Sequence, residues 1–169
     1  KTPIHGLVLR SRLSLDRELL DQLPDLQWIA RSGSGLDNID MEAAHQKGIA
    51  LHSSPEGNRD AVGEHTLGML LNTLHRLSSG DASVRSGAWD REGHRGRELK
   101  HLTVGIIGYG HMGSAFAQRL AGFGCRVLAY DKYKEGWGEQ PQVKAPLPHV
   151  VPVGSDVLAK EADVVRLHV

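Results

Sequence analysis

The sequence is poor in the features that mark secreted, membrane-spanning and metal-bound proteins. Its 169 residues contain one cysteine, Cys125, which excludes an internal disulfide and a thiolate cluster for a metal. The ten histidines lack a ligand spacing such as H-x-x-x-H, so we predict no metal site. We find no signal peptide and no long apolar run, and we therefore expect a cytoplasmic location and no membrane partner.

Net charge is also absent, because 20 basic residues balance 20 acidic ones. This balance gives no electrostatic reason to expect a nucleic acid or an acidic membrane surface as a partner. The length suits one domain or two small ones, with enough residues for a real core. Cys125 lies in an apolar setting, which favours a buried core residue over a reactive thiol.

The most informative stretch is Thr103 to Asp131. A short apolar β-type run comes first and leads into the glycine-rich turn Gly108–Gly113. A helical apolar pattern follows, and a second strand is expected over 126–130, directly before Asp131. The order strand, glycine turn, helix, strand and acid is typical of a dinucleotide-binding βαβ unit.

Each part of this stretch has a physical role in binding a dinucleotide. Gly108 permits a tight turn, Gly110 lets the backbone approach a pyrophosphate, and Gly113 permits close contact between helix and strand. The helix N-terminus favours phosphate charge, so the backbone of Gly108, Tyr109, Gly110, His111, Met112 and Gly113 is predicted to bind the cofactor. Asp131 follows Gly113 by 18 residues and can accept hydrogen bonds from ribose hydroxyls. Because it would repel a 2′-phosphate, we predict NAD rather than NADP.

The first 55 or so residues alternate between strand and helix patterns. We expect strands over 4–10, 26–31 and 49–52, and helices over 14–23 and 40–47, capped by Ser14 and Asp40. This βαβαβ order predicts a small parallel sheet.

A long helix is predicted from Asn58 or Asp60, with an apolar stripe from Leu67 to Leu77, and it can extend to Ser86 unless 78–80 breaks it. A polar connector leads to residue 101, and a Pro- and Gly-rich excursion covers 132–154. Ser155 is expected to cap a short helix before a last strand over 163–169. Because both ends lie in or beside strand patterns, we expect the chain to be part of a larger protein.

Several segments together resemble the D-2-hydroxyacid dehydrogenases, particularly the D-3-phosphoglycerate dehydrogenase branch. The matching segments are, in chain order, 9–12, 33–40, Asn58 with 61–66, 87–89, 98–99, the turn at 108–113, 162–165 and 167–169. Two positions depart from the family: Gly63 stands where Ala is usual, and Arg166 where Ser is usual.

The resemblance implies an α/β fold in which a long helix joins two partial domains. Residues 1–57 would form part of a flavodoxin-like substrate domain, and 101–169 the first half of a Rossmann-type NAD-binding domain. Residues 58–100 would form the long interdomain helix and a connector, and the family forms homodimers through this helix. The Leu67–Leu77 stripe would then lie in the core or in the dimer interface.

The resemblance also implies site residues and an activity, the NAD-dependent oxidation of a D-2-hydroxy acid, with 3-phosphoglycerate the expected substrate. Ser34 and Gly35 would hold the substrate carboxylate, and Arg10 its phosphate. Val62 and His168 would border the cofactor. The catalytic Arg, Glu and His of the family belong to motifs that would follow Val169, so we predict no catalytic residue in this chain and no turnover by it alone. An NAD(H)-binding corepressor-like module is the alternative, and a purely structural piece that no longer holds cofactor is a third possibility.

Overall fold

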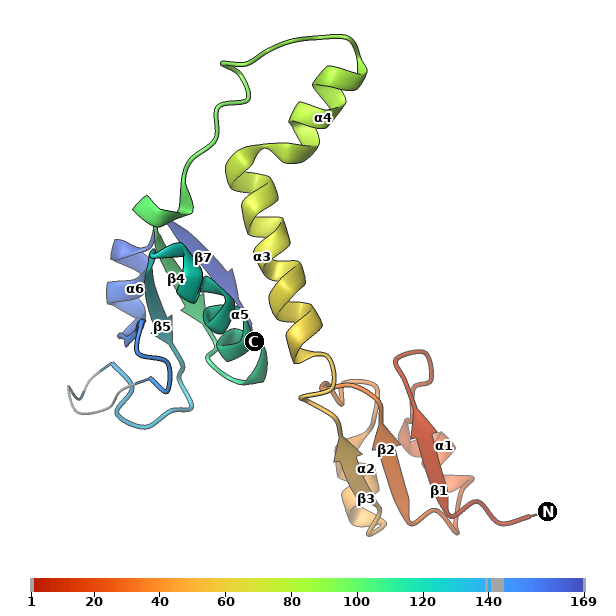
Figure 1. Cartoon of the computed structure of the whole chain (residues 1–169). Helices are drawn as coiled ribbons and strands as arrows, with labels where there is room; N and C mark the ends of the chain where they lie inside the picture. Colours follow the sequence, from red (N-terminus) through yellow and green to blue (C-terminus); the bar gives the residue numbers. More distant parts are fainter. Residues whose placement is uncertain (1, 139, 141–144, 169) are drawn as a thin grey trace. The chain divides into compact units, whose positions relative to one another are not determined.

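The computed structural model describes residues 2–138, 140 and 145–168, and it forms two compact units, 1–58 and 59–169 (Figure 1). Both units are built on parallel β-sheets, as the alternation of strand and helix patterns predicts. The segment 59–100, which we expected to join two domains, packs with the second unit.

The first unit is a three-stranded parallel sheet with two short helices. Its strands lie in the order β1, β2, β3 and its elements are β1 (Gly6–Leu9), α1 (Arg17–Asp21), β2 (Trp28–Arg31), α2 (Met41–Gln46) and β3 (Ala50–Ser53). Leu9 and Ile29 on the sheet are buried with Leu20 of α1 and Ala43 of α2. These residues form a core of their own, so the first unit is stabilised from within.

Helix α1 begins later than we predicted. Its N-cap is Asp16, whose Oδ1 accepts a hydrogen bond from the Leu19 N–H at 2.9 Å, and not Ser14. The reason lies in Leu15, which forms a parallel bridge with Ile39 and keeps the chain extended up to Asp16. Asp40 caps α2 as predicted, because its Oδ1 accepts from the Ala43 N–H at 2.8 Å.

The second unit is a parallel sheet covered on both faces. Its strands lie in the order β6, β5, β4, β7, and they are β4 (Thr103–Ile107), β5 (Arg126–Tyr130), β6 (Val150–Pro152) and β7 (Val164–Leu167). Its helices are α3 (Arg59–His75), α4 (Leu77–Arg85), α5 (His111–Leu120) and α6 (Ser155–Glu161), with 3₁₀ turns at Leu99–His101 and Ala121–Phe123. Helices α3 and α5 share a core with one face of the sheet, and α6 packs on the other face (Figure 1).

Two features of the segment after Asp131 differ from expectation. The excursion contains the edge strand β6, which pairs with β5 and ends at Pro152. A proline is tolerated there because an edge strand needs no hydrogen-bond donor on its outer side. Ser155 is the first residue of α6 and not its cap, since Gly154 occupies the N-cap position without a side-chain hydrogen bond.

The predicted long helix is interrupted, and the break is not at 78–80. Arg76 adopts a left-handed conformation, with φ 54°, which separates α3 from α4, and Gly80 lies inside α4. The Oδ1 of Asn72 accepts hydrogen bonds from both the backbone N–H and the hydroxyl of Ser78, at 2.8 and 3.0 Å. A side chain from the end of α3 therefore stabilises the start of α4.

The apolar stripe of α3 packs inside the second unit. Its members Leu67, Leu70, Leu71 and Leu74 contact the core between α3, α5 and the sheet, whereas Leu77 is 56% exposed. Arg119 of α5 joins the same two helices through Asp60 and Glu64 of α3, at 3.2 and 3.3 Å. A Cβ at Gly63 would lie 2.9 Å from an Arg119 nitrogen, so the departure to glycine makes room for this arginine.

Cys125 is buried, as predicted, and burial raises the pKa of its thiol. Within the described ranges, no helix has the length and apolar character needed to cross a bilayer. The described side chains also include no group of three His, Cys, Asp or Glu arranged to bind a metal ion.

Candidate functional site

The carboxyl ends of β4, β5 and β7 meet around a cavity of about 500 Å³. The chain leaves β4 into α5 on one face of the sheet and reaches β7 through α6 on the other, so the loops diverge between β4 and β7. Open α/β sheets bind ligands at such a divergence. The cavity is lined by Ile107, Gly108, Gly110, Tyr130, Asp131, Lys132, Tyr133 and His168.

The glycine turn has a geometry that only glycine permits at two of its three positions. Gly108 has a left-handed φ of 89°, and its N–H donates to the Tyr130 carbonyl at 2.8 Å. A Cβ on Gly113 would lie 2.0 Å from the Gly108 carbonyl oxygen, so α5 packs directly on the turn. A Cβ on Gly110 would meet no atom within 4 Å, which leaves open space beside the backbone at the helix start.

Asp131 is fixed by the turn that it faces. Its Oδ2 accepts a hydrogen bond from the Tyr109 N–H at 2.8 Å, and its Oδ1 accepts one from the Tyr133 N–H at 3.0 Å. A carboxylate offers about four acceptor sites, so capacity remains for two further donors from the cavity. The turn and the acid are therefore locked together before any ligand arrives.

This arrangement fits a dinucleotide. The N-terminus of α5 has no side-chain cap, so no capping side chain competes with a pyrophosphate for the positive end of the helix dipole beside Gly110. The free acceptor sites of Asp131 suit the vicinal hydroxyls of an adenosine ribose.

The three variable residues of the turn differ in position. The Tyr109 side chain is only 3% exposed and lies in the core, where burial raises the pKa of its hydroxyl. His111 is exposed and Met112 is half-buried, on the first turn of α5. The cavity lining includes none of these side chains, so their backbone groups are the ones that a ligand can use.

His168 directly follows β7 and lines the cavity next to the turn. Its N–H donates to the Ile107 carbonyl at 2.8 Å, and its ring lies 5.7 Å from the ring of Phe116. Burial, and then the positive charge of Arg166, lower the pKa of the imidazole below its ordinary value of 6.5. The side chain is therefore neutral near pH 7.

We expect the lowered pKa of His168 to make the folded protein less stable as the solution becomes acidic. Because the unfolded chain binds the proton more readily, stability rises with pH across the window between the lowered folded pKa and 6.5, and is lost as pH falls through it. NMR titration should place the pKa of His168 below 6.5, and His168→Gln should reduce the stability lost between pH 7.5 and pH 5. The exposed His101→Gln is the control, and a His168 pKa at or above 6.5 would contradict the expectation.

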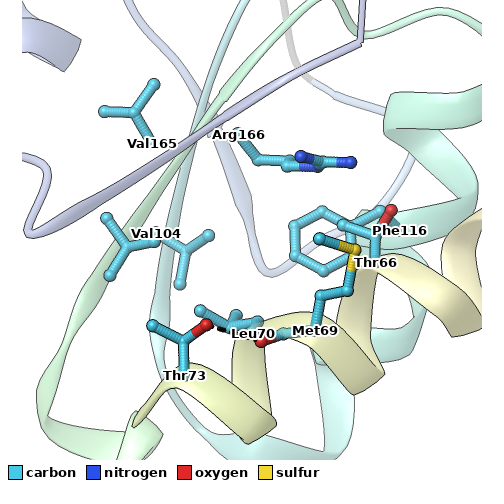
Figure 2. A pocket seen from close by; sticks show the side chains of 9 residues that line it. Thr66, Met69, Leu70, Thr73, Val104, Phe116, Val165 and Arg166 are labelled. Carbon is cyan, nitrogen blue, oxygen red and sulfur yellow. Dashed lines mark hydrogen bonds between the residues drawn. The ribbon is translucent and has the colours of Figure 1, made fainter.

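A second, smaller cavity of about 170 Å³ lies between α3, α5 and β7. Figure 2 shows Arg166 extending over Phe116 and Met69, with Thr66 and Thr73 on the side of α3. Arg166, which stands where the family usually has Ser, thus places a positive charge beside this cavity. Val62, also on α3, belongs to the lining of neither cavity.

In the first unit, the loop after β2 contains the predicted carboxylate-binding residues. Ser34 is exposed and Gly35 half-buried, and the Ser54 N–H donates to the Gly33 carbonyl at 3.0 Å. Arg10 directly follows β1 and is exposed, and its carbonyl accepts a hydrogen bond from the Asn38 amide at 3.2 Å. Asn38 thereby connects the loops after β1 and β2 at the carboxyl ends of these strands.

Sequence reasoning missed Arg31 in this loop and Lys132 and Tyr133 at the larger cavity. Arg31 ends β2, and its guanidinium fills the space beside Gly33, where a Cβ would lie 1.7 Å from an arginine nitrogen. Its Nε is buried without a hydrogen-bond partner in the described part of the chain. Their positions in the sequence could have indicated these residues. Arg31 is a cation just before a glycine-containing loop, and Lys132 and Tyr133 directly follow Asp131.

Comparison with known proteins identifies the second unit. The family profile of the D-isomer specific 2-hydroxyacid dehydrogenase NAD binding domain matches residues 67–169. A D-3-phosphoglycerate dehydrogenase of Mycobacterium tuberculosis is 40% identical over 128 residues, which are 76% of this chain and 24% of that protein. A hydroxypyruvate reductase of Thermotoga maritima is 34% identical over 163 residues, or 96% of this chain and 50% of that protein.

Solved structures agree with these relatives. The D-lactate dehydrogenase of Aquifex aeolicus, complexed with NAD and lactic acid, has a TM-score of 0.84 and 32% identity, and the match covers 98% of this chain and 48% of that one. This chain thus spans half or less of the length of these relatives. The comparisons confirm the predicted Rossmann-type fold and NAD as the cofactor. Because the NAD-binding profile matches 103 of the 169 residues, the chain belongs to the D-isomer specific 2-hydroxyacid dehydrogenase family.

Proposed function

We propose that this chain supplies the cofactor-binding turn and a substrate-anion loop of an enzyme that oxidises a D-2-hydroxy acid with NAD, and that the acid is 3-phosphoglycerate. The observation that carries the proposal is the lock between Asp131 and the turn, in which the Tyr109 N–H donates to Oδ2 at 2.8 Å beside the open Gly110. Bound NAD would accept the hydride from the carbon that bears the hydroxyl group.

In this proposal the residues of the second unit bind and orient the cofactor. The backbone of Gly108–Gly113 would hold the pyrophosphate, and Asp131 would hold the adenosine ribose and repel a 2′-phosphate. His168 would border the cofactor as a neutral side chain, and Val62 on α3 is proposed to approach it as well. The acid–base and arginine motifs of the family have no matching positions in 1–169, so we propose that these residues alone do not turn over substrate.

The choice of 3-phosphoglycerate is supported by two arginines of the first unit. Arg10 follows β1 and Arg31 ends β2, so both lie at the carboxyl edge of the same parallel sheet as Ser34 and Gly35. The buried Arg31 Nε has no partner among the described residues, and burial of an unpaired donor is unfavourable unless an anion binds there. We propose that the loop backbone binds the carboxylate and that these arginines bind the phosphate.

Ligand titration followed by NMR tests this assignment. We expect 3-phosphoglycerate to shift the amide signals of Gly33 to Gly35, and Arg31→Ala to weaken its binding by about tenfold, the loss of one charge-assisted contact. Arg12→Ala, which changes an exposed arginine in the same region, should leave the affinity unchanged. D-glycerate lacks the phosphate and should bind equally weakly to both variants.

Two results would count against the assignment. If D-glycerate binds as tightly as 3-phosphoglycerate, the arginines do not recognise a phosphate and another 2-hydroxy acid is the substrate. If neither compound shifts the Gly33–Gly35 signals, the loop is an ordinary connection between strand and helix.

We also propose that the protein forms a homodimer through the segment that follows α3. The support is the exposure of three large apolar side chains on α4 and the connector, Leu77, Val84 and Trp89. The cytoplasmic location remains a prediction as well.

A further inference from the structure

Trp137 lies outside the glycine motif and outside the cavity lining, yet its side chain packs against a residue of the glycine turn. It follows Asp131 by six residues and is only 6% exposed. Its indole Nε1–H donates to the carbonyl of Ala129 at 2.7 Å. Ala129 is on β5, two residues before Asp131, so this hydrogen bond holds the loop against the strand that presents the acid.

The ring of Trp137 packs on the residue that the acid holds. Its centroid lies 5.1 Å from the centroid of Tyr109, with an angle of 35° between the ring planes. The Tyr109 N–H donates to Asp131, so Tyr109 is fixed from two sides, its backbone by the carboxylate and its ring by the indole. The side chain at this position of the turn is therefore a core residue that connects the turn to the loop after β5.

The backbone around Trp137 is shaped to place the indole there. Gly136 and Gly138 flank it with left-handed φ angles of 67° and 78°. A Cβ on Gly138 would lie 2.1 Å from the carbonyl carbon of Val153, so the loop closes tightly against the end of β6. The left-handed conformation at Gly136 and Gly138, which glycine adopts readily, thus shapes the loop that contains Trp137.

We propose that Trp137 is a positioning residue for NAD binding, because it holds Tyr109 and thereby the orientation of the turn and of Asp131. The proposal rests on the assignment of this turn as the cofactor site. A tryptophan that only filled the core would need no contact with the turn. Here both contacts lead to the two groups that a dinucleotide needs, the Gly108–Gly113 backbone and the carboxylate.

Trp137→Leu in the complete chain, compared with Leu158→Ala, tests the proposal. Leu158 is 1% exposed and packs on the opposite face of the sheet, in a cluster that contains neither Trp137 nor a residue of the Gly108–Gly113 turn, so its truncation lowers stability and leaves the Trp137–Tyr109 contact in place. Three quantities are measured for each: the melting temperature, amide hydrogen exchange of residues 108–113, and the NADH affinity by calorimetry. We expect both variants to melt earlier.

Only Trp137→Leu should accelerate exchange at the turn, and it should weaken NADH binding about tenfold. Trp137→Phe retains a ring against Tyr109 and should recover most of the affinity. If Trp137→Leu does not fold, Tyr109→Leu removes the same ring contact from the other side and should give the same two losses.

The outcomes separate this inference from the assignment of the site. If the unsubstituted chain does not bind NADH, the proposed function fails, and exchange at the turn alone decides whether Trp137 positions it. If the chain binds NADH and Trp137→Leu matches Leu158→Ala in exchange and affinity, the inference is overturned. If exchange at the turn accelerates while NADH affinity is unchanged, Trp137 orders the turn without serving the cofactor, and the inference fails as well.

Discussion

Replacing Asp131 with Ala is expected to weaken NADH binding by about two orders of magnitude, or roughly 2.7 kcal/mol. The carboxylate can accept charge-assisted hydrogen bonds from both ribose hydroxyls, each worth about 1.5–3 kcal/mol. The substitution also removes the acceptor of the Tyr109 N–H, which fixes the turn at 2.8 Å. Calorimetric titration of the complete chain measures the loss directly.

The preference between cofactors should change in the same variant. Asp131 would repel the 2′-phosphate of NADPH, so Asp131→Ala and Asp131→Asn, which both remove the charge, should reduce the ratio of NADH to NADPH affinity by a similar factor. Asp131→Asn keeps an acceptor for the Tyr109 N–H and should therefore lose less NADH affinity than Asp131→Ala. Comparison of the two variants separates the electrostatic part from the loss of the hydrogen bond within the turn.

Asp163→Ala is the matched control for Asp131→Ala. Its Oδ2 also accepts a backbone hydrogen bond, from the Thr103 N–H at 2.9 Å, but at the amino end of β4, the opposite edge of the same sheet. We expect this control to retain its NADH affinity. Equal losses in both variants would mean that Asp131 acts through general stability, and an unchanged affinity in Asp131→Ala would remove it from the site.

The cofactor unit could be predicted from the sequence because its parts are neighbours in the chain. The strand, turn, helix and second strand all lie between Thr103 and Asp131, and each carries a local signal of periodicity, glycine spacing or charge. The acid's position at the end of β5 follows from the motif alone. The cavity around these residues then results from parallel pairing of β4 and β5.

The features that escaped prediction depend on contacts between distant segments. Leu15 is held extended by Ile39, 24 residues later, and this contact moves the start of α1 to Asp16. The break at Arg76 has no glycine or proline to announce it, and it is stabilised by the Asn72 side chain bonding to Ser78. Local propensity is a weak prior where such tertiary contacts decide the outcome.

Side-chain burial was harder to predict at the sites themselves. Tyr109 occupies a variable position of the motif, where a side chain normally has no assigned role. Its ring is buried in the core against Trp137, which lies in a loop that has the sequence of an irregular excursion. Arg31 likewise has the sequence appearance of a solvated strand end. Its enclosure by Gly33 depends on how the loop after β2 folds back.

Alanine at two glycines of the turn is expected to have different effects on stability. Gly113→Ala places a Cβ 2.0 Å from the Gly108 carbonyl oxygen and 3.3 Å from Ile106, and neither the helix nor the turn can move away without breaking their contact. Overpacking of this kind costs about 1–3 kcal/mol, so the melting temperature of the second unit should fall by roughly 10 °C. NADH binding should be lost with the turn geometry.

Gly110→Ala should lower stability much less than Gly113→Ala does, and should reduce NADH affinity by about tenfold or more. A Cβ at Gly110 meets no protein atom within 4 Å, so alanine there makes no clash within the folded chain. The space that the methyl group takes is the space that a pyrophosphate needs beside the start of α5. Calorimetry with NADH and thermal unfolding of both variants test the contrast. An unchanged NADH affinity in Gly110→Ala would mean that the pyrophosphate binds away from this turn. An unchanged melting temperature in Gly113→Ala would mean that α5 and the turn are less closely packed than they are in the structure.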